Sequence, residues 1–339
     1  MISWWQNAQK PLLILILGTT LLLISFVLSL CIGSIFISPI TVMQALFNPD
    51  LLNLDHVLVT TTRLSRSVIA LVVGGCLAVS GCLMQALTRN PLASPSIFGI
   101  NAGATFSIII CSMIFQLDSM QQYMWAALLG TFVAGAMVYA IGTMGTGRFN
   151  PIRIVLAGAA ITALFGSFTQ ALLVIDQEGL DSILFWLAGS VANRQLDTLT
   201  ALLPYIGVAL IGAFLLAKPI NILMAGDEIS KGLGQRTALV QMLMGIAVTV
   251  LAGCAVAMAG NIVFVGLIVP HIVRKLMSTA IAHEWLIPGC MIFGALLLLI
   301  ADMVARVIIF PQEIPIGVMT AFLGAPLFIY LIRRGMRHG

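Results

Sequence analysis

Hydrophobic residues lie along this chain in long uninterrupted runs separated by short polar segments. A helix needs about 20 apolar residues to cross the hydrocarbon core of a bilayer, whereas strands of a membrane barrel would alternate apolar and polar positions. The runs therefore predict an all-α polytopic membrane protein with about ten transmembrane helices. The predicted spans are residues 11–33, 67–88, 97–115, 124–143, 153–175, 199–217, 239–258, 261–277, 285–306 and 314–332.

Two of these spans need arguments of their own. The run from Pro11 to Gly33 is longer than the apolar region of a signal peptide, and no small-x-small cleavage site follows it, so we expect it to remain as a helix. The span 261–277 is the least regular, because Gly266 and Pro270 interrupt it. No loop is long enough to fold separately, and we expect residues 1–339 to form a single transmembrane domain.

The composition agrees with a membrane protein and excludes other classes. Hydrophobic residues make up 60% of the chain and charged residues 8%, and the mean hydropathy is +1.10. Soluble domains are about a quarter charged, so this chain cannot cover a globular surface with charge, and it is too hydrophobic for intrinsic disorder. All six cysteines lie inside apolar runs without a CxxC pair, which indicates packing rather than disulfides.

Basic residues are distributed unevenly between the predicted loops. With the N-terminus placed in the cytoplasm, all but four of the 16 Lys and Arg residues fall on the cytoplasmic side, as expected for cytoplasmic loops. This assignment also places the C-terminus in the cytoplasm, and it makes the net charge of +4 a topology signal rather than a sign of nucleic-acid binding. The arginines expected outside are Arg63, Arg66, Arg194 and Arg306.

Motifs for intrinsic catalysis or ion coupling are missing from the sequence. No GxxxxGK[ST], HExxH or GxSxG pattern and no Cys/His metal cluster occurs, so we expect no catalytic residue, no cofactor and no metal site. The span centres hold almost no carboxylate or histidine that could bind a coupling ion. Asp302 and Arg306, near the outer end of one span, are spaced to form a helical ion pair, and His271 and Arg274 are expected to anchor an inner helix end.

A rigid, non-helical turn is predicted after the second span. Residues 89–95 contain an Asn and two prolines, and residues 99–104 that follow are rich in glycine and alanine. Irregular backbone at membrane depth is tolerated only where protein or water lines it. The segment is therefore either a constriction of a transport pathway or a tight turn without a role in transport.

The run Ser80–Pro95, read as SGCLMQALTRNPLASP, resembles the signature of the permease subunits of ABC importers for ferric siderophores, haem and cobalamin, and is closest to the ferric-chelate branch. Further matches to that family follow in order along the chain. They lie at residues 63–66, 153–158, 185–190, 264–271, 301–306 and 313–326. The resemblance implies the type II importer fold, in which ten helices form one permease domain.

The resemblance implies a docking role for three arginines. In the family, arginines at these positions form salt bridges with glutamates of an extracytoplasmic substrate-binding protein, and the matching residues here are Arg63, Arg66 and Arg306. The alternative is that they anchor helix ends. Ser65 replaces the proline that the family carries between the first two arginines, which puts in doubt the rigid helix start but not the charge pairing.

A cytoplasmic loop resembles the family's segment that couples the permease to its ATPase. It differs from that segment by Asp227 in place of Glu and by Ser230 in place of Ala, and we expect two short helical pieces broken at Gly232 and Gly234. The alternative is a plain solvated loop. The predicted coupling residues are Gly226, Asp227, Glu228, Ile229, Ser230, Lys231, Gly232, Leu233 and Gly234.

The same resemblance implies a cytoplasmic gate at Asn90, Pro91 and Leu92, with Asn150 and Pro151 as a second candidate. The implied partners are a second permease subunit, identical or homologous, a cytoplasmic ABC ATPase dimer and the binding protein. The implied cargo is a ferric chelate, with haem or cobalamin as alternatives, and the implied location is the bacterial cytoplasmic (inner) membrane. A secondary transporter or channel is less well supported, because it needs the mid-membrane coupling residues that are scarce here. An intramembrane enzyme is less well supported too, since no catalytic group is visible.

Overall fold

The computed structural model of the chain describes residues 2–33, 35–144, 150–175, 187–192, 194–277, 282–309 and 312–335. Within these ranges the chain forms helices joined by turns and irregular segments, and none of it forms a strand. The helices are α1 (Ile2–Cys31), α2 (Pro39–Phe47), α3 (Leu54–Val57), the π-helix η1 (Leu58–Arg63), α4 (Leu64–Thr88), the 3-10 helix η2 (Pro95–Phe98), α5 (Ile100–Phe115), α6 (Met120–Thr143), α7 (Pro151–Ile175), α9 (Leu196–Leu215), α10 (Ala217–Met224), α11 (Asp227–Gly232), α12 (Thr237–Ala259), α13 (Val265–Met277), α14 (His283–Val307) and α15 (Ile316–Gly335).

These helices confirm the predicted all-α membrane fold, since every predicted span contains a helix at the expected place. Among the described residues, seven helices are long and apolar enough to cross a membrane. Two shorter apolar helices, Ile100–Phe115 and Ile316–Ile329, correspond to two further predicted spans. The remaining one is α13, whose 13 residues are the shortest of the set.

The helix α13 begins four residues after the predicted start of its span, at Val265 instead of residue 261. Gly260 (φ 73°) and Phe264 (φ 69°) both have left-handed backbone, which ends α12 and delays the next helix. Such a conformation is strained for a bulky residue like Phe. The aromatic side chain of Phe264 lies against Gly324 of α15, where any Cβ atom would collide with it.

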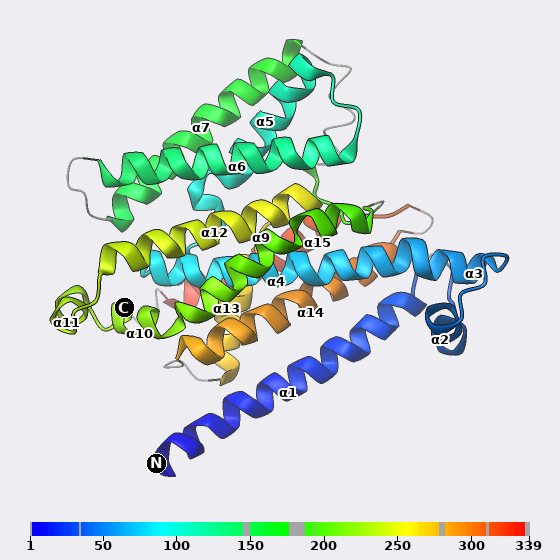
Figure 1. Cartoon of the computed structure of the whole chain (residues 1–339), viewed down its shortest axis with the longest axis horizontal. Helices are drawn as coiled ribbons and strands as arrows, with labels where there is room; N and C mark the ends of the chain where they lie inside the picture. Colours follow the sequence, from blue (N-terminus) through cyan, green and yellow to red (C-terminus); the bar gives the residue numbers. More distant parts are fainter. Residues whose placement is uncertain are drawn as a thin grey trace.

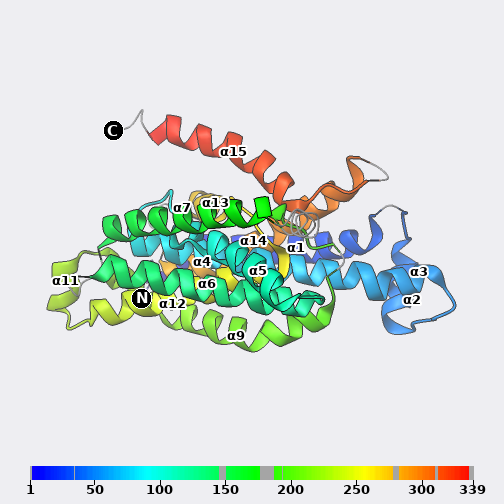
Figure 2. The same cartoon turned by 90° about the horizontal axis from the view of Figure 1, so that it is seen from above.

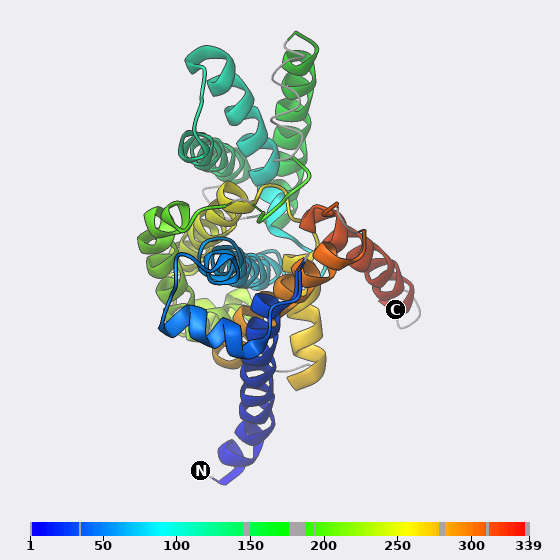
Figure 3. The same ribbon diagram turned by 90° about the vertical axis from the view of Figure 1, so that its right-hand side faces the viewer.

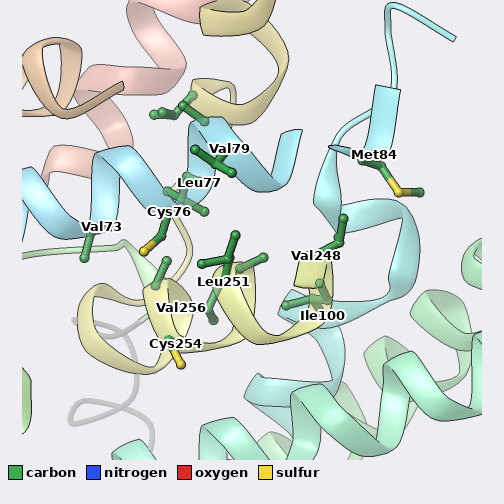
Figure 4. Close-up of a cluster of buried hydrophobic side chains, with 14 of the residues drawn as sticks. Val73, Cys76, Leu77, Val79, Met84, Ile100, Val248, Leu251, Cys254 and Val256 are labelled. Carbon is green, nitrogen blue, oxygen red and sulfur yellow. The ribbon is translucent and has the colours of Figure 1, made fainter. Parts of the chain in front are cut away.

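The helix α4 lies at the centre of the bundle and packs against α12, α13 and α14 (Figures 1 and 3). In the most apolar window of this span, 83% of the residues are buried, compared with 17% for α1. Figure 4 shows Val73, Cys76, Leu77 and Val79 of α4 beside the apolar side chains of α12. The backbones approach closely where small residues meet, because a Cβ atom at Gly81 would collide with the carbonyl of Gly266.

The other helices surround this centre in distinct groups. Helices α5, α6 and α7 pack together on one side, while α1 lies on the opposite side of the molecule (Figure 1). The apolar side chains of α1 are largely exposed, as expected for a helix that faces lipid. Helix α15 projects from the bundle, and α9 lies on the other side of α4 from it (Figures 2 and 3). The side chain of Phe322 on α15 is 73% exposed.

The long axis of the bundle has two ends that carry the candidate sites. We call the end where α4 begins and where α1 and α14 finish the arginine end, because Arg63, Arg66 and Arg306 lie there. The opposite end, where α11 lies, is called the α11 end (Figure 1). At the α11 end, α4 finishes at Thr88 and α7 begins at Pro151, so both predicted gate segments lie there.

Candidate functional site: the two ends of the helix bundle

A buried ion-pair network joins three elements at the arginine end. Arg66 of α4 donates from Nε to both carboxylate oxygens of Asp302, at 2.8 and 3.1 Å, and from Nη1 to Glu313 at 2.6 Å. Arg306 Nη2 lies 2.8 Å from the second oxygen of Asp302. Asp302 is completely buried and is shared by two guanidinium groups. The network fixes the start of α4, the end of α14 and the segment before α15 relative to one another.

Arg306 of this network and the neighbouring Arg63 also bind the end of α1. Arg63 Nη1 donates to the carbonyls of Leu30 and Cys31 at 2.8 and 2.7 Å, and its Nη2 donates to Ile35. Arg306 Nη1 donates to the carbonyls of Ser29 and Ile32 at 3.0 and 2.9 Å. The last carbonyls of a helix have no partner within the helix, and cations stabilise that end of its dipole. The arginines therefore satisfy the C-terminus of α1 and hold it against α4 and α14.

The three arginines predicted to dock a binding protein are thus enclosed and internally bonded. Their exposed fractions are 6% for Arg63, 7% for Arg66 and 4% for Arg306. The alternative role weighed from the sequence, anchoring of helix ends, is what these contacts perform. The predicted i to i+4 pair of Asp302 and Arg306 is confirmed. Docking of a binding protein through these side chains stays a prediction, because the contacts within the chain leave each of the three arginines at most 7% exposed.

The first gate segment, at the α11 end, is a compact turn. Arg89 has left-handed backbone (φ 50°) and ends α4, after which the Asn90 side chain accepts a hydrogen bond from the Leu92 backbone at 2.9 Å. Pro91 and Leu92 are exposed. The second segment forms the same kind of turn, because the Asn150 side chain accepts a hydrogen bond from the Ile152 backbone at 3.0 Å. Pro151 is the first residue of α7. Both Asn-Pro sequences therefore form rigid turns at the same end of the bundle.

The predicted coupling segment forms a self-contained unit with α10. Ser230 is fully buried, and its hydroxyl group bonds to the carbonyls of Ile222 and Gly226 at 2.8 and 2.7 Å. The Gln235 side chain donates to the carbonyl of Pro219 at 2.8 Å. The segment holds one short helix, α11, and then turns at Gly234 (φ 75°), whereas two pieces broken at Gly232 and Gly234 were expected.

The tip of this unit is exposed although part of it is apolar. Ile229 is 55% exposed and Leu233 is 68% exposed, and Glu228 and Lys231 lie at the surface beside them. The side chain of Asp227 lies outside the described residues, although its backbone begins α11. An exposed apolar pair on a short, internally bonded element is typical of a surface that packs against another protein.

A contact missed in the sequence connects this unit to α14. Asn221 of α10 donates to the Glu284 carboxylate at 2.6 Å and accepts from the His283 backbone at 3.0 Å. The ring Nδ1 of His283 also lies 2.7 Å from the Asn221 side-chain oxygen. These three residues, which we call the Asn221 latch, attach α10 to the first residues of α14. Since Asn221 and His283 are far apart in the sequence, no local pattern could have revealed the contact.

A second polar contact at the α11 end explains the predicted anchoring of Arg274. Its Nη1 donates to the Gln85 side chain at 2.7 Å, and the Gln85 amide donates to the carbonyl of Leu267 at 3.1 Å. Gln85 is 3% exposed. The last turn of α4 is therefore attached to α13 through an amide that the sequence reading did not single out.

The predicted turn at residues 89–104 borders a cavity within the bundle. The cavity has a volume of about 240 Å³, and Ser94, Asn101 and Phe264 are among its lining residues. Asn101 donates to the Asn261 side chain at 2.6 Å, which joins the start of α5 to the segment before α13. The resemblance motif at 185–190 is described only in part, because Phe185 and Trp186 lie outside the described residues. Within it, Gly189 accepts from the Gly317 backbone at 3.0 Å.

Comparisons with known proteins agree with this architecture. The family model described as the FecCD transport family matches residues 21–334. The chain is 47% identical over 283 residues, 84% of each chain, to a protein of Bacillus subtilis (strain 168) called the probable siderophore transport system permease protein YfiZ. It is 37% identical over 332 residues, 97% of each chain, to the Fe(3+)-citrate import system permease protein YfmD of the same organism.

Two further similarities come from an enteric bacterium and from a solved structure. The ferric enterobactin transport system permease protein FepD of Escherichia coli (strain K12) is 38% identical over 319 residues, 94% of each chain. A solved structure described as an inward-facing conformation of a putative metal-chelate type ABC transporter superposes with a TM-score of 0.83 and 32% identity. That match covers 95% of this chain and 99% of the solved one.

Proposed function

The chain belongs to the FecCD transport family, and from this premise we propose that it is the permease subunit of an ABC importer that carries ferric siderophores or other ferric chelates. The observation that carries the choice of cargo is that three similar permeases are named for a siderophore, for Fe(3+)-citrate and for ferric enterobactin. A hemin permease, HmuU of Yersinia pestis, is 38% identical over 80% of this chain, which makes haem the second candidate. Cobalamin ranks third.

The energy for transport comes, in this proposal, from a separate ABC ATPase dimer in the cytoplasm. The sequence holds no phosphate-binding motif of its own. The exposed apolar tip at Ile229 and Leu233, on a unit that is held together by Ser230, offers a firm surface for that partner. The α11 end then faces the cytoplasm, as do both termini, and residues 1–339 act as one transmembrane domain of the bacterial inner membrane.

The arginine end then faces outward and receives the substrate-binding protein. We assign Arg63, Arg66 and Arg306 to this docking region, where their bonds hold the ends of α1, α4 and α14 in fixed positions. Their contribution in this reading is the shape of the docking surface. The cargo passes from the binding protein into the permease at this end.

A second permease subunit completes the pathway in this proposal. Two similar proteins, YfmD and YfmE, are both named as permeases of the Fe(3+)-citrate import system of one organism, which supports importers with paired permeases. The exposed face of α15, including Phe322, is apolar and suits a permease neighbour. The turns at Asn90–Leu92 and Asn150–Pro151 then close the pathway at its cytoplasmic end, one set from each subunit.

The proposal is tested by uptake of radiolabelled ferric chelates in iron-starved cells with and without the gene, with labelled cobalamin and haem as parallel substrates. We expect the strain without the gene to lose ferric-chelate uptake. We also expect that a variant lacking residues 226–234 does not restore this uptake. Unchanged iron uptake with loss of haem or cobalamin uptake would replace the cargo and keep the mechanism. Full activity of the 226–234 deletion would remove the coupling segment from the proposal.

A further inference from the structure

The short helix α2, at the arginine end, leaves one of its apolar sides uncovered. Val42 and Ala45 of this helix are buried, where they pack with Leu30 and Cys31 of α1 and with Val59 of η1. Four other apolar side chains of α2 are exposed, and we call them the α2 face. They are Ile40 (72% exposed), Met43 (51%), Leu46 (38%) and Phe47 (74%). An uncovered apolar patch of this kind marks a contact with lipid or with another protein.

The polar residues of α2 lie opposite part of this face. Residues three positions apart share one side of an α-helix. Thr41 and Gln44 therefore form a polar edge, while Met43 and Leu46 form an apolar edge nearly opposite to it. The Gln44 side chain is exposed as well. A helix that lies in the membrane interface has this arrangement, with its polar edge toward water and its apolar edge toward the acyl chains.

The depth of α2 along the bundle agrees with such a position. The apolar part of α1, Gln9–Cys31, has 23 residues. A helix of that length is about 35 Å long and slightly exceeds the hydrocarbon core of about 30 Å. The last turn of α1 therefore lies at the boundary of that core, and Leu30 and Cys31 of this turn pack against α2. At this level α2 runs across the long axis of the bundle (Figures 1 and 3).

The surroundings of α2 favour lipid over a protein partner. The α1 helix beside it already has exposed apolar side chains toward lipid, among them Leu23 and Leu28. Helix α2 lies on the other side of α4 from α15, and so away from the face proposed for a second permease (Figures 2 and 3). The sequence has no charged residue from Ile35 to Pro49 that could orient a protein partner.

The turn that follows α2 differs from the α2 face. Leu51 and Leu52 are also exposed there, at 84% and 94%. Asp50 directly precedes them, however, and Asp55 begins the next helix. Carboxylates are unfavourable among acyl chains, so this turn is not included in the lipid contact.

We propose that α2 lies in the interface of the lipid bilayer and that the α2 face contacts the acyl chains, with Gln44 toward water. The partner of this surface is thus the membrane and not the substrate-binding protein. The contact holds the segment between α1 and α4 at the level of the lipid headgroups. Only the choice of leaflet, the outer one, rests on the proposed function.

The test places a nitroxide spin label at two neighbouring positions, Met43→Cys and Gln44→Cys, in the permease–ATPase complex. The complex is held in nanodiscs of phosphatidylethanolamine and phosphatidylglycerol. A Cys111→Ser background is suitable, because Cys111 is half-buried and the other five native cysteines are buried. Molecular oxygen, which concentrates in lipid, and a water-soluble nickel chelate each relax the label. Leu23→Cys on α1 is the lipid-facing reference.

We expect the ratio of oxygen to nickel accessibility at Met43 to match that at Leu23 and to exceed that at Gln44 about fivefold or more. Equal ratios at Met43 and Gln44 would overturn the inference. Immobilisation of the Met43 label by the purified binding protein of the same system would also overturn it, and would assign the α2 face to docking. Equal melting temperatures of the labelled and unlabelled complexes exclude misfolding. The comparison does not involve cargo, so failure of the uptake experiment leaves it intact.

Discussion

The two ends of this bundle use polar residues in opposite ways. At the arginine end, Arg63, Arg66 and Arg306 are buried and direct their donors inward, onto a carboxylate and the carbonyls of α1. At the α11 end, the polar groups of Ser230 and Gln235 close a small unit upon itself and leave Ile229 and Leu233 exposed. The charged residues thus join helices within the chain, and the apolar ones are left for a partner. A charge is therefore an unreliable guide to a docking surface unless its internal partners are known.

The largest expected effect comes from breaking the arginine network. Asp302→Asn leaves the charges of Arg66 and Arg306 buried without their shared carboxylate, and removing one partner of a buried ion pair costs about 3–5 kcal/mol. We expect a large fall in melting temperature of the detergent-purified permease, measured by intrinsic fluorescence. Glu313→Gln is the matched control and should have a much smaller effect, because the Glu313 side chain is 41% exposed. Equal effects of the two variants would contradict the distinction.

The second prediction concerns the apolar tip of the α11 end. Replacing Ile229 and Leu233 together with Asp should reduce the amount of co-purified ATPase about tenfold or more, because two charges then enter the packed interface. The melting temperature of the permease should stay unchanged, since both side chains are exposed within the chain. Lys231→Gln, an exposed position on the same helix, serves as the control. If the double variant lowered the melting temperature as much as Asp302→Asn does, Ile229 and Leu233 would be needed for the stability of the permease and not for binding the ATPase.

The Asn221 latch gives an intermediate effect and tests whether the two ends are connected through α14. Asn221→Ala removes the bonds to His283 and Glu284, so movement of the α10–α11 unit is transmitted less firmly. We expect several-fold less substrate transported per ATP hydrolysed in proteoliposomes, with the ATPase still bound. Glu284→Gln keeps an acceptor for Asn221 and should retain most of the coupling. An unchanged ratio in Asn221→Ala would exclude the latch from transmission.

The smallest expected effect lies at the turn after α11. Gly234 has φ 75°, a backbone region that other residues enter at a cost of about 1 kcal/mol, so Gly234→Ala should strain this turn slightly. We expect faster proteolysis within the loop and a modest loss of co-purified ATPase. Gly232→Ala is the comparison, because Gly232 lies within α11 and nothing stands near its Cβ position. Equal proteolysis of the two variants would show that the turn tolerates a side chain.

The helices could be predicted from sequence because membrane insertion imposes one simple rule, a run of apolar residues of sufficient length. The rule failed at residues 261–264, where Gly260 and Phe264 have left-handed backbone and the Phe264 side chain packs against Gly324 of a helix distant in the sequence. The helical pair of Asp302 and Arg306 was predictable because both residues lie on one helix, four positions apart.

The partners of the site residues could not be predicted in this way. Arg66 meets Asp302 across 236 positions of sequence, and Arg63 bonds to backbone carbonyls that no side-chain pattern reports. The family resemblance proposed the segments, and the atomic contacts show which of their residues are already bonded within the chain.

The central position of α4 also has a consequence for how the protein is made. The helix is complete in the sequence at Thr88, but its packing partners α12 and α14 begin only at Thr237 and His283. At a synthesis rate of about 5–20 residues per second, α4 waits roughly 10 to 40 seconds in the membrane before α14 is translated. During that time its glycine-lined faces contact lipid or the insertion machinery. Assembly of this bundle therefore requires α4 to stay in the membrane without its main packing partners until α12 and α14 have been synthesised.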